Sequence, residues 1–469
     1  MTPPSALPNP TTPLPTSQLT RRTARFVDSE FTLIEALRAL MLYSSKPALA
    51  YPLVIANNTL GSLSDLLTHE NTDVVGVVVE VIEDWTDEDV LEPDDDDDEG
   101  EGEGDGGQAT SVERKLEVMR ALVDDLGSKG TLASVISTLE RFDEDVDEER
   151  AGVYHTLAVV ENLVALSPLV VLELIKRDSP LFSWLIRRFC GAQDKASAER
   201  DQNRFYAAEI LAILLATTTT DEGVREARRL LTPAVDDVLG VLAAFRNRDP
   251  SGAEETEFME NVFDLLCSAL SEPEVKRAFL DGEGVELMVI MMKNKRLSRL
   301  RAIKTLDHAL AAGDAGDLSG QLCERFVEAL GLKTLFAAFM STAGRRKGGG
   351  ATAASTATTH EDTEHMLSVM ASLFTSLASE TPARIRLLTK FVEDDYAKTD
   401  RLVEVREDVE RRVEHAAQAA LAASELGMDD DELYMEKLEK GLASLQYIDY
   451  IIAWLCQEDD GVRPAFARC

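Results

Sequence analysis

The histidines and acidic residues are the side chains whose spacing could support metal or acid–base chemistry. His360 and His365 enclose acidic residues as an HExxH zinc site does. They lie one position too far apart, however, to share a helical face as i, i+4 ligands do. The acidic stretch 143–147 matches the first half of a calcium-binding loop, but Glu148 stands where that loop needs glycine and Tyr154 where it needs glutamate. The start of an acidic helix is the simpler interpretation of this stretch.

The remaining patterns do not indicate catalysis either. Gly282 and Gly284 flank a glutamate, but no Lys-Ser or Lys-Thr follows them as in a phosphate-binding loop. No GxSxG is present, and His155 and His308, the best lone candidates for a general base, lie in helical sequence where structural histidines are commoner. We therefore expect no catalytic residues, no metal and no cofactor, with an enzyme as the less favoured alternative.

The charge balance narrows the class of partner. The chain has 48 Lys and Arg against 85 Asp and Glu, a net charge of −37, and it stays acidic when the acidic tract 93–107 is set aside. Binding to nucleic acid needs a basic surface that releases counterions from the phosphates. We therefore expect no direct nucleic-acid binding and favour basic protein segments as partners.

The cysteines and the hydropathy indicate a reducing compartment and no membrane. The five cysteines are scattered and form no CxxC, which predicts reduced thiols in a cytosolic or nuclear protein. They are Cys190, Cys267, Cys323, Cys456 and Cys469. Cys267 lies in an apolar run, where a thiol is most often a core residue. No apolar run approaches the ~18 residues of a membrane span, and the N-terminus has no signal-peptide pattern.

The elements that position these side chains are helices in a repeating frame. Six stretches carry apolar residues at offsets +1, +4 and +8 from a small or helix-breaking start, which places them on one helical face. The starts are Thr59, Thr131, Leu181, Ala234, Gly284 and Gly331. They recur about every 50 residues, just above the ~40–47 of HEAT and armadillo repeats. Because such units bury their apolar faces only by stacking, the sequence predicts an all-α, armadillo/HEAT-like superhelical repeat solenoid.

A second helix type recurs between these stretches and predicts a binding groove. Segments 79–85, 159–164, 265–270, 305–310 and 373–378 share the order apolar, any residue, polar, apolar. In armadillo repeats the third helix of each unit lines the concave face, where a polar ladder holds extended peptides. The candidate peptide-binding residues are Glu83, Asp84, Glu161, Asn162, Glu209, Asp264, Ser268, Asp307 and His308. The alternative for each residue alone is a solvated polar position between core residues.

Composition divides the chain into four parts. We expect a disordered Pro/Thr-rich tail over 1–28 and the repeat solenoid over 29–393. The solenoid would contain an acidic disordered insertion at 93–107 and a flexible loop at 344–359. A charged helix that projects from the body and a capping helix would follow over 394–456, and a tail over 457–469.

Several segments, in collinear order from about 25 to 456, resemble the beta-catenin-like protein 1 family. The most specific are HENTDV at 69–74 and GVYHTLAVVENL at 152–163, and further ones are LERFDE at 139–144, ENVFDLLCSAL at 260–270, FLDGEGVELM at 279–288, KTLDHAL at 304–310 and segment 431–456. The resemblance implies a nuclear armadillo-type solenoid that is associated with the spliceosome through the nineteen complex. It also implies binding to basic, nuclear-localisation-like segments of splicing factors, with the Myb-repeat subunit as the best expected partner.

The tryptophans set this chain apart from importin-alpha, whose grooves use repeated Trp–Asn pairs. The chain has only Trp85, Trp184 and Trp454, and none is followed by asparagine at +4. Peptide recognition would therefore be less aromatic and more electrostatic. The alternative function is a structural scaffold that docks or self-associates, for example as a homodimer, through apolar solenoid ends such as the final helix at 438–455.

Overall fold

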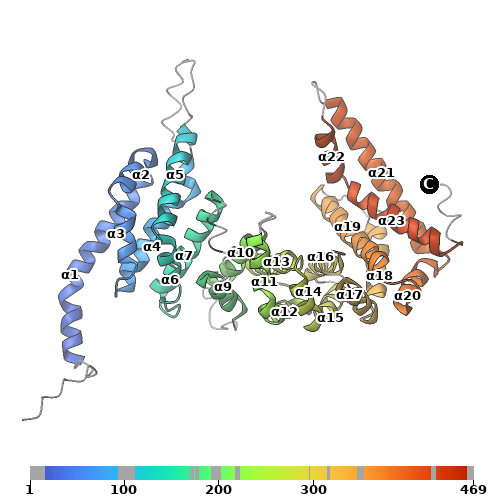
Figure 1. Cartoon of the computed structure of the whole chain (residues 1–469), viewed down its shortest axis with the longest axis horizontal. Helices are drawn as coiled ribbons and strands as arrows, with labels where there is room; N and C mark the ends of the chain where they lie inside the picture. Colours follow the sequence, from blue (N-terminus) through green and yellow to red (C-terminus); the bar gives the residue numbers. More distant parts are fainter. Residues whose placement is uncertain are drawn as a thin grey trace, which may run out of the picture. The chain divides into compact units, whose positions relative to one another are not determined.

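The computed structural model describes residues 16–92, 111–167, 170, 174, 179–191, 202–216, 222–294, 296–313, 317–345, 353–423 and 429–461. Within these residues all regular secondary structure is helical, which confirms the predicted all-α class (Figure 1). The acidic insertion expected at 93–107 lies outside the described residues.

The helices follow one another in groups of three, which we call the first, second and third helices of a repeat. The first helices are α2 (Pro47–Ala56), α5 (Ser111–Ser128), α11 (Glu222–Leu230), α14 (Pro273–Asp281), α17 (Leu318–Glu328) and α20 (Pro382–Val392). The second helices are α3 (Thr59–Leu66), α6 (Thr131–Thr138), α9 (Pro180–Cys190), α12 (Val235–Ala243), α15 (Gly284–Lys293), α18 (Gly331–Arg345) and α21 (Ala397–Ala423). The third helices are α4 (Thr72–Thr86), α7 (Asp147–Leu166), α10 (Gln202–Ala216), α13 (Ala253–Ala269), α16 (Ser298–Leu310), α19 (Ala353–Ser376) and α23 (Leu442–Glu458). Helix α1 (Thr16–Leu40) precedes the first group and α22 (Asp430–Glu439) lies within the last.

The repeating frame in the sequence corresponds to the second helices. Four of the six predicted starts are the first residues of α3, α6, α15 and α18, and the other two lie within one residue of the starts of α9 and α12. All the apolar residues of the frame are buried, for example Leu60, Leu63 and Leu67 of α3. One helical face of each second helix therefore packs into the core, as the offsets predicted.

A residue with positive φ precedes several second helices and turns the chain into them. These residues are Asn58 (φ 53°), Gly130 (φ 71°), Glu283 (φ 59°) and Leu330 (φ 64°). Glycine follows two of them because the backbone passes close to a phenylalanine of the first helix. A Cβ atom on Gly284 would lie 2.4 Å from the ring of Phe279, and one on Gly331 would lie 2.4 Å from the ring of Phe326.

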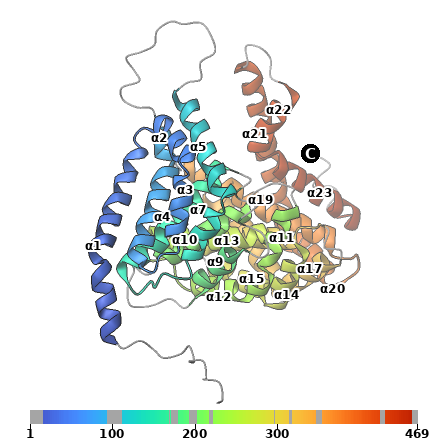
Figure 2. The same ribbon diagram turned by 60° about the vertical axis from the view of Figure 1, so that its left-hand side comes forward.

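By their internal contacts the residues form two compact units. Unit 1 comprises Met1–Leu174, Asp178–Trp184 and Gln193–Tyr206, and unit 2 comprises Ile175–Arg177, Leu185–Ala192 and Ala207–Cys469. In unit 1, α4 packs between α1 and α7 (Figures 1 and 2). In unit 2, the third helices α13, α16, α19 and α23 pack in succession.

Helix α4 shows how packing overrides local preference. Its sequence is rich in valine, which is a poor helix former because its branched side chain loses rotamer freedom. The valines from Val74 to Val81 are nevertheless buried in a helix, since α1 and α7 cover both sides. Asn71 caps the helix by accepting a hydrogen bond from the Asp73 amide at 2.9 Å.

Two expected flexible segments are partly helical instead. Helix α1 begins at Thr16, so the tail expected over 1–28 is wrong for 16–28, and residues 1–15 lie outside the described part. Within the expected tail every proline precedes Thr16, so no proline interrupts α1. The loop expected at 344–359 is also shorter, because α18 extends to Arg345 and the Ala/Thr-rich stretch from Ala353 joins α19.

The charged helix expected to project from the body packs against it instead. Helix α21 contacts α18, α20, α22 and α23. The single final helix predicted at 438–455 is two helices, because Gly441 takes a φ of 106° between α22 and α23. Ile448, Ile451 and Leu455 of α23 are buried, so this helix covers the face of α19.

A buried arginine joins three of the last helices. Arg384 of α20 is 1% exposed and donates hydrogen bonds from Nε to both carboxylate oxygens of Glu458 on α23, at 3.1 and 3.2 Å. It also donates to the carbonyl oxygen of Phe374 on α19. Its guanidinium lies over the rings of Phe374 and Trp454, 4.6 and 4.7 Å from their centroids.

The structure places two of the described cysteines in the core. Cys267 and Cys323 are buried thiols outside any disulfide. Burial raises the pKa of the Cys267 thiol to about 12, so it stays neutral and acts as a core residue. None of the described helices is long and apolar enough to span a membrane.

Candidate functional site

In unit 1, polar side chains of α4 and α7 connect the two third helices. The ring nitrogen Nδ1 of His155 donates to the Glu83 carboxylate, and this bond is the largest cause of the raised pKa of His155. Asn162 donates from Nδ2 to Thr86 Oγ1 at 3.4 Å. At the other end of α7, Glu149 accepts a hydrogen bond from the hydroxyl of Thr72 at 2.8 Å.

Asp84, also on α4, has a carboxylate that is buried in part. Its Oδ2 atom is buried and has no hydrogen-bond partner among the described residues. Burial is the main reason that its pKa is raised, and the negative charges of Asp87, Glu83 and Glu80 raise it further, while a hydrogen bond from Ser44 opposes them. The last turns of α4 therefore concentrate negative charge.

Glu161 also contacts a neighbouring helix. The Tyr206 hydroxyl donates to its carboxylate, and the Tyr206 ring lies 5.2 Å, between centroids, from that of Tyr154. Glu209, on α10, is partly exposed. Glu83, Asn162 and Glu161, predicted as ligands of a peptide, thus hold third helices together.

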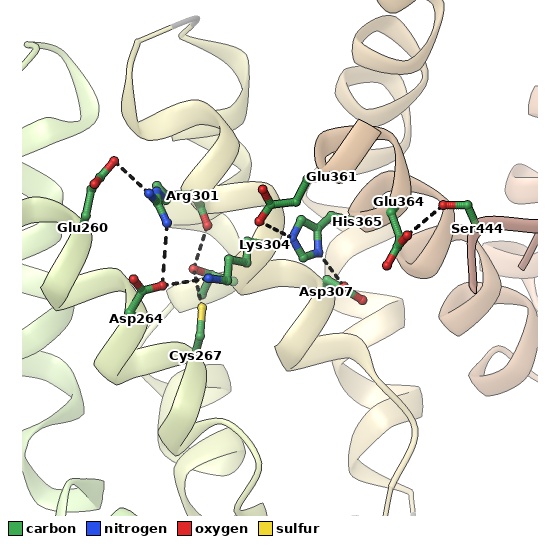
Figure 3. A network of polar contacts seen from close by, with 11 residues as sticks. Glu260, Asp264, Cys267, Arg301, Lys304, Asp307, Glu361, Glu364, His365 and Ser444 are labelled. Carbon is green, nitrogen blue, oxygen red and sulfur yellow. Dashed lines mark hydrogen bonds and ion pairs between the residues drawn. The ribbon is translucent and has the colours of Figure 1, made fainter. Parts of the chain in front are cut away.

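In unit 2 the same arrangement recurs between α13 and α16. Arg301 forms an ion pair with Glu260 at 2.8 Å, and Lys304 forms one with Asp264 at 2.8 Å (Figure 3). The side chains of Glu260 and Asp264 are both 41% exposed. These two carboxylates lie one helical turn apart, and solvent reaches both.

The row continues onto α19 and α23. His365 Nδ1 donates to Asp307 Oδ2 at 2.9 Å, and Ser444 donates to Glu364 Oε2 at 2.9 Å (Figure 3). Although burial lowers the pKa of His365, the hydrogen bond and charge of Asp307 outweigh it, and the net pKa is raised. Of the two remaining candidates, Ser268 is partly exposed on α13 and His308 is exposed on α16.

The structure therefore places the nine candidates on third helices and reveals partners that the sequence did not show. We call the row of third-helix acids and their partners the polar ladder. In unit 1 it consists of Glu83, His155, Glu161 and Tyr206. In unit 2 it consists of Glu260, Asp264, Arg301, Lys304, Asp307, His365, Glu364 and Ser444. Eight ladder residues were not among the candidates: His155, Tyr206, Glu260, Arg301, Lys304, Glu364, His365 and Ser444. The first five share a helix with a candidate, whereas the last three lie on α19 and α23, which carry none.

The patterns that resembled metal sites serve packing. His365 pairs with Asp307, whereas His360 contacts Arg412 on α21. Asp143 accepts a hydrogen bond from the Asp145 amide at 3.0 Å, and Glu149 accepts one from the Asp143 amide at 2.7 Å, so the calcium-like stretch forms a turn before α7. Within the described residues no cluster of three or more metal-ligating side chains occurs.

The tryptophans pack inside the repeats rather than along a groove. Trp85 is fully buried and donates from Nε1 to the Leu40 carbonyl at 3.0 Å. Trp184 is buried as well and donates to the Leu139 carbonyl at 3.1 Å. The absence of an importin-like tryptophan array among the described residues agrees with the sequence.

Comparison with known proteins decides the family. A family model described as "Catenin-beta-like, Arm-motif containing nuclear" matches residues 18–468. The chain belongs to this family. Beta-catenin-like protein 1 of Homo sapiens and that of Rattus norvegicus are each 34% identical to it over 443 residues, which are 92% of this chain and 70% of the relative. The beta-catenin-like protein 1 homolog of Schizosaccharomyces pombe is 33% identical over 441 residues, 93% of this chain and 68% of the relative.

Membership of this catenin-beta-like family confirms both the resemblance and the armadillo class of the solenoid. The family is a scaffold type built for protein interaction and is described as nuclear. The two most specific strings of the resemblance lie where repeats meet. HENTDV contains Asn71 and Thr72 at the start of α4, and GVYHTLAVVENL contains His155 and Glu161 of the polar ladder.

Proposed function

We propose that this chain is a nuclear, non-enzymatic scaffold that binds basic segments of other proteins along the acidic residues of its third helices. The observation that carries the proposal is the pair Glu260 and Asp264, which are exposed and one turn apart in a row of acids on successive third helices. The Arm-motif family and the net charge of −37 support it.

Binding would proceed by exchange of ion pairs. Lys or Arg side chains of the ligand would replace Arg301 and Lys304 at Glu260 and Asp264, so that no bare carboxylate has to be desolvated first. Exposed ion pairs contribute only ~0–1 kcal/mol each. Affinity would therefore be modest, spread over several contacts and sensitive to salt.

The resemblance supplies the partner class in this proposal. We propose splicing factors of the nineteen complex, and foremost its Myb-repeat subunit, as the proteins whose basic, nuclear-localisation-like segments bind. A nuclear location agrees with the description of the family. A strongly acidic chain is suited to such segments and repels nucleic acid.

The test is a double variant that removes charge but keeps side-chain size. Glu260→Gln with Asp264→Asn should weaken binding of a basic segment of the Myb-repeat factor about tenfold, or ~1.4 kcal/mol. Arg301 and Lys304 would then add local repulsion. Calorimetric titration of the full chain measures this effect.

A matched control is Glu328→Gln on first helix α17. The Glu328 side chain is 66% exposed, and its ion pair with Arg325 is long, at 3.9 Å. It removes a charge outside the polar ladder and should leave the affinity unchanged. Equal melting temperatures exclude misfolding of the double variant. If the double variant binds as tightly as the wild type, the basic segment does not bind at this face.

A second candidate function rests on exposed apolar side chains at the N-terminal end. They belong to α1, α2 and the turn between them: Phe26, Val27, Phe31, Leu42, Leu49 and Leu53. A scaffold that docks or self-associates through this end would bind in a salt-independent manner, because burial of apolar surface drives it. Sedimentation of the chain at low and high salt distinguishes this function from the first.

A further inference from the structure

A groove of about 940 Å³ lies in unit 2, on a surface that the polar ladder does not use. Its walls are the second helices α15 and α18 and the third helices α16 and α19. None of the ladder residues is among the side chains that line it. The groove therefore needs an explanation of its own.

The interior of the groove is apolar, and its edge carries exposed apolar side chains. Met292, Ile303 and Met366 line it and belong to or adjoin the core. Ile290 and Leu297 lie at its edge and are about half exposed. Exposed apolar side chains grouped at a concave surface are typical of interaction sites.

Leu330 at the same edge is costly to the fold in two ways. It is 70% exposed, and its φ of 64° is in the left-handed region that bulky side chains avoid. Of the other residues with positive φ directly before a second helix, Asn58, Gly130 and Glu283 are polar or glycine, and Tyr396 before α21 is only partly exposed. A strained leucine that is 70% exposed is expected where function requires an apolar contact.

The charge around the groove is opposite to that of the chain as a whole. Lys293, Arg296, Arg299 and Lys333 line it, together with the carboxylates of Asp249 and Asp362. Asp249 is already bound, to Arg296 at 3.1 Å and to the Leu297 amide at 2.9 Å. Lys293 and Lys333 are exposed and form no ion pair with any described residue. The rim can therefore receive carboxylates from outside.

The shape of the α18 wall suits a helix. Leu330, Thr334, Ala337, Ala338 and Ser341 line the groove at helical spacing, over a length of ~16 Å or three turns. Apart from Leu330 these side chains are small, so another backbone can approach closely. Three turns are the length over which anchors at i, i+3 or i+4 and i+7 engage a groove.

We propose that this groove binds an amphipathic, acidic helix of a partner protein. Its apolar face would contact Ile290, Leu297 and Leu330, and its Asp or Glu side chains would pair with Lys293 and Lys333. The acidic tract 93–107 of this chain does not fit this description, because it contains no large apolar side chain and is rich in glycine.

Labelled synthetic peptides test the proposal on the full chain by fluorescence anisotropy. The probe has leucines at i, i+3, i+4 and i+7 and glutamates beside them, and a second peptide has glutamines in place of the glutamates. At physiological salt, screening beyond about 8 Å limits the effect of the overall negative charge. We expect the glutamate peptide to bind at least about tenfold more tightly than the glutamine peptide and than a copy interrupted by proline.

Variants then assign the site. Leu330→Asn should weaken the glutamate peptide about tenfold without lowering the melting temperature, since asparagine tolerates a positive φ. Lys293→Glu with Lys333→Glu should weaken the glutamate peptide and leave the glutamine peptide unchanged. Ile385→Gln, at an exposed isoleucine on α20, is the control and should bind as the wild type.

The outcomes separate this inference from the proposed function. The basic segment should bind Leu330→Asn as tightly as the wild type, because the ladder is intact. The inference is overturned if the glutamate peptide binds no more tightly than the glutamine or proline peptide. It is also overturned if Leu330→Asn retains full affinity for the glutamate peptide.

Discussion

At the scale of single residues, Asp84 combines a stability cost with a candidate role in binding. Its buried Oδ2 has no partner among the described residues, and its pKa is raised chiefly by burial. A carboxyl whose folded pKa is raised loses stability as the pH rises through that pKa. At neutral pH the fold therefore holds a charge that it would be more stable without, as is common at functional sites.

We expect Asp84→Asn to stabilise the fold and weaken binding. Its free energy of unfolding should rise by ~1 kcal/mol at pH 7, because the buried charge and its repulsion from neighbouring acids are removed. The gain should vanish near pH 4, where the wild-type carboxyl is protonated. Urea unfolding at the two pH values measures it. A destabilised Asp84→Asn at pH 7 would show that the carboxylate has a stabilising partner.

The sequence identified the acids of the site but not their partners. Glu83, Glu161, Asp264 and Asp307 could be placed on one helix type because the repeat fixes their register. Their contacts with His155, Tyr206, Lys304 and His365 depend on how one repeat stacks on the next. No local pattern encodes that stacking, so the sequence predicted a free acidic groove where the structure has acids that are already engaged.

At the scale of helices, two histidine–carboxylate pairs connect third helices and should make stability depend on pH. Both His155 and His365 have a raised pKa in the fold. Their contribution is fully present below the unfolded pKa of ~6.5 and is lost as the pH rises through the folded value. The free energy of unfolding should therefore decline from about pH 6.5 upward.

A double variant isolates this effect. His155→Asn with His365→Asn should flatten the decline, and His415→Asn, at an exposed position on α21, should leave it unchanged. The measurement is the urea midpoint across that pH range. The same slope in wild type and double variant would mean that the two pairs stay uncharged or contribute nothing.

The buried ion pair of Arg384 and Glu458 should stabilise the packing of α20, α19 and α23. Arg384→Met leaves Glu458 without its partner and removes two cation–π contacts. We expect a loss of ~3 kcal/mol in the free energy of unfolding. Arg384→Met with Glu458→Gln should recover part of it, which a double-mutant cycle measures. A loss below ~1 kcal/mol would mean that apolar packing alone holds these helices.

The helices themselves were largely predictable, for a physical reason. A frame of offsets 1, 4 and 8 marks a buried helical face, and the starts at Thr59, Thr131, Gly284 and Gly331 follow a turn that the sequence partly signals. The helix starts at Thr16 and Ala353 were missed because Thr- and Ala-rich stretches without apolar periodicity resemble loops. The break at Gly441 was missed because apolar spacing continues across it.

At the scale of the whole molecule, the net charge of −37 is the property that most constrains the function. We expect it to repel nucleic acid and to attract basic segments, while the repeat fold presents acids on third helices. Family membership shows the armadillo scaffold, and we propose that the charge gives it a preferred class of ligand. We propose that this attraction is electrostatic.

The most direct test is calorimetric titration of the wild-type chain with the basic segment of the Myb-repeat splicing factor at low and high salt. Raising the salt from about 0.05 to about 0.5 M shortens the screening length several-fold. We expect Kd to rise about tenfold or more over this range. A Kd that is indifferent to salt would contradict it and assign binding to the apolar ends, and no binding at low salt would contradict the proposed ligand class.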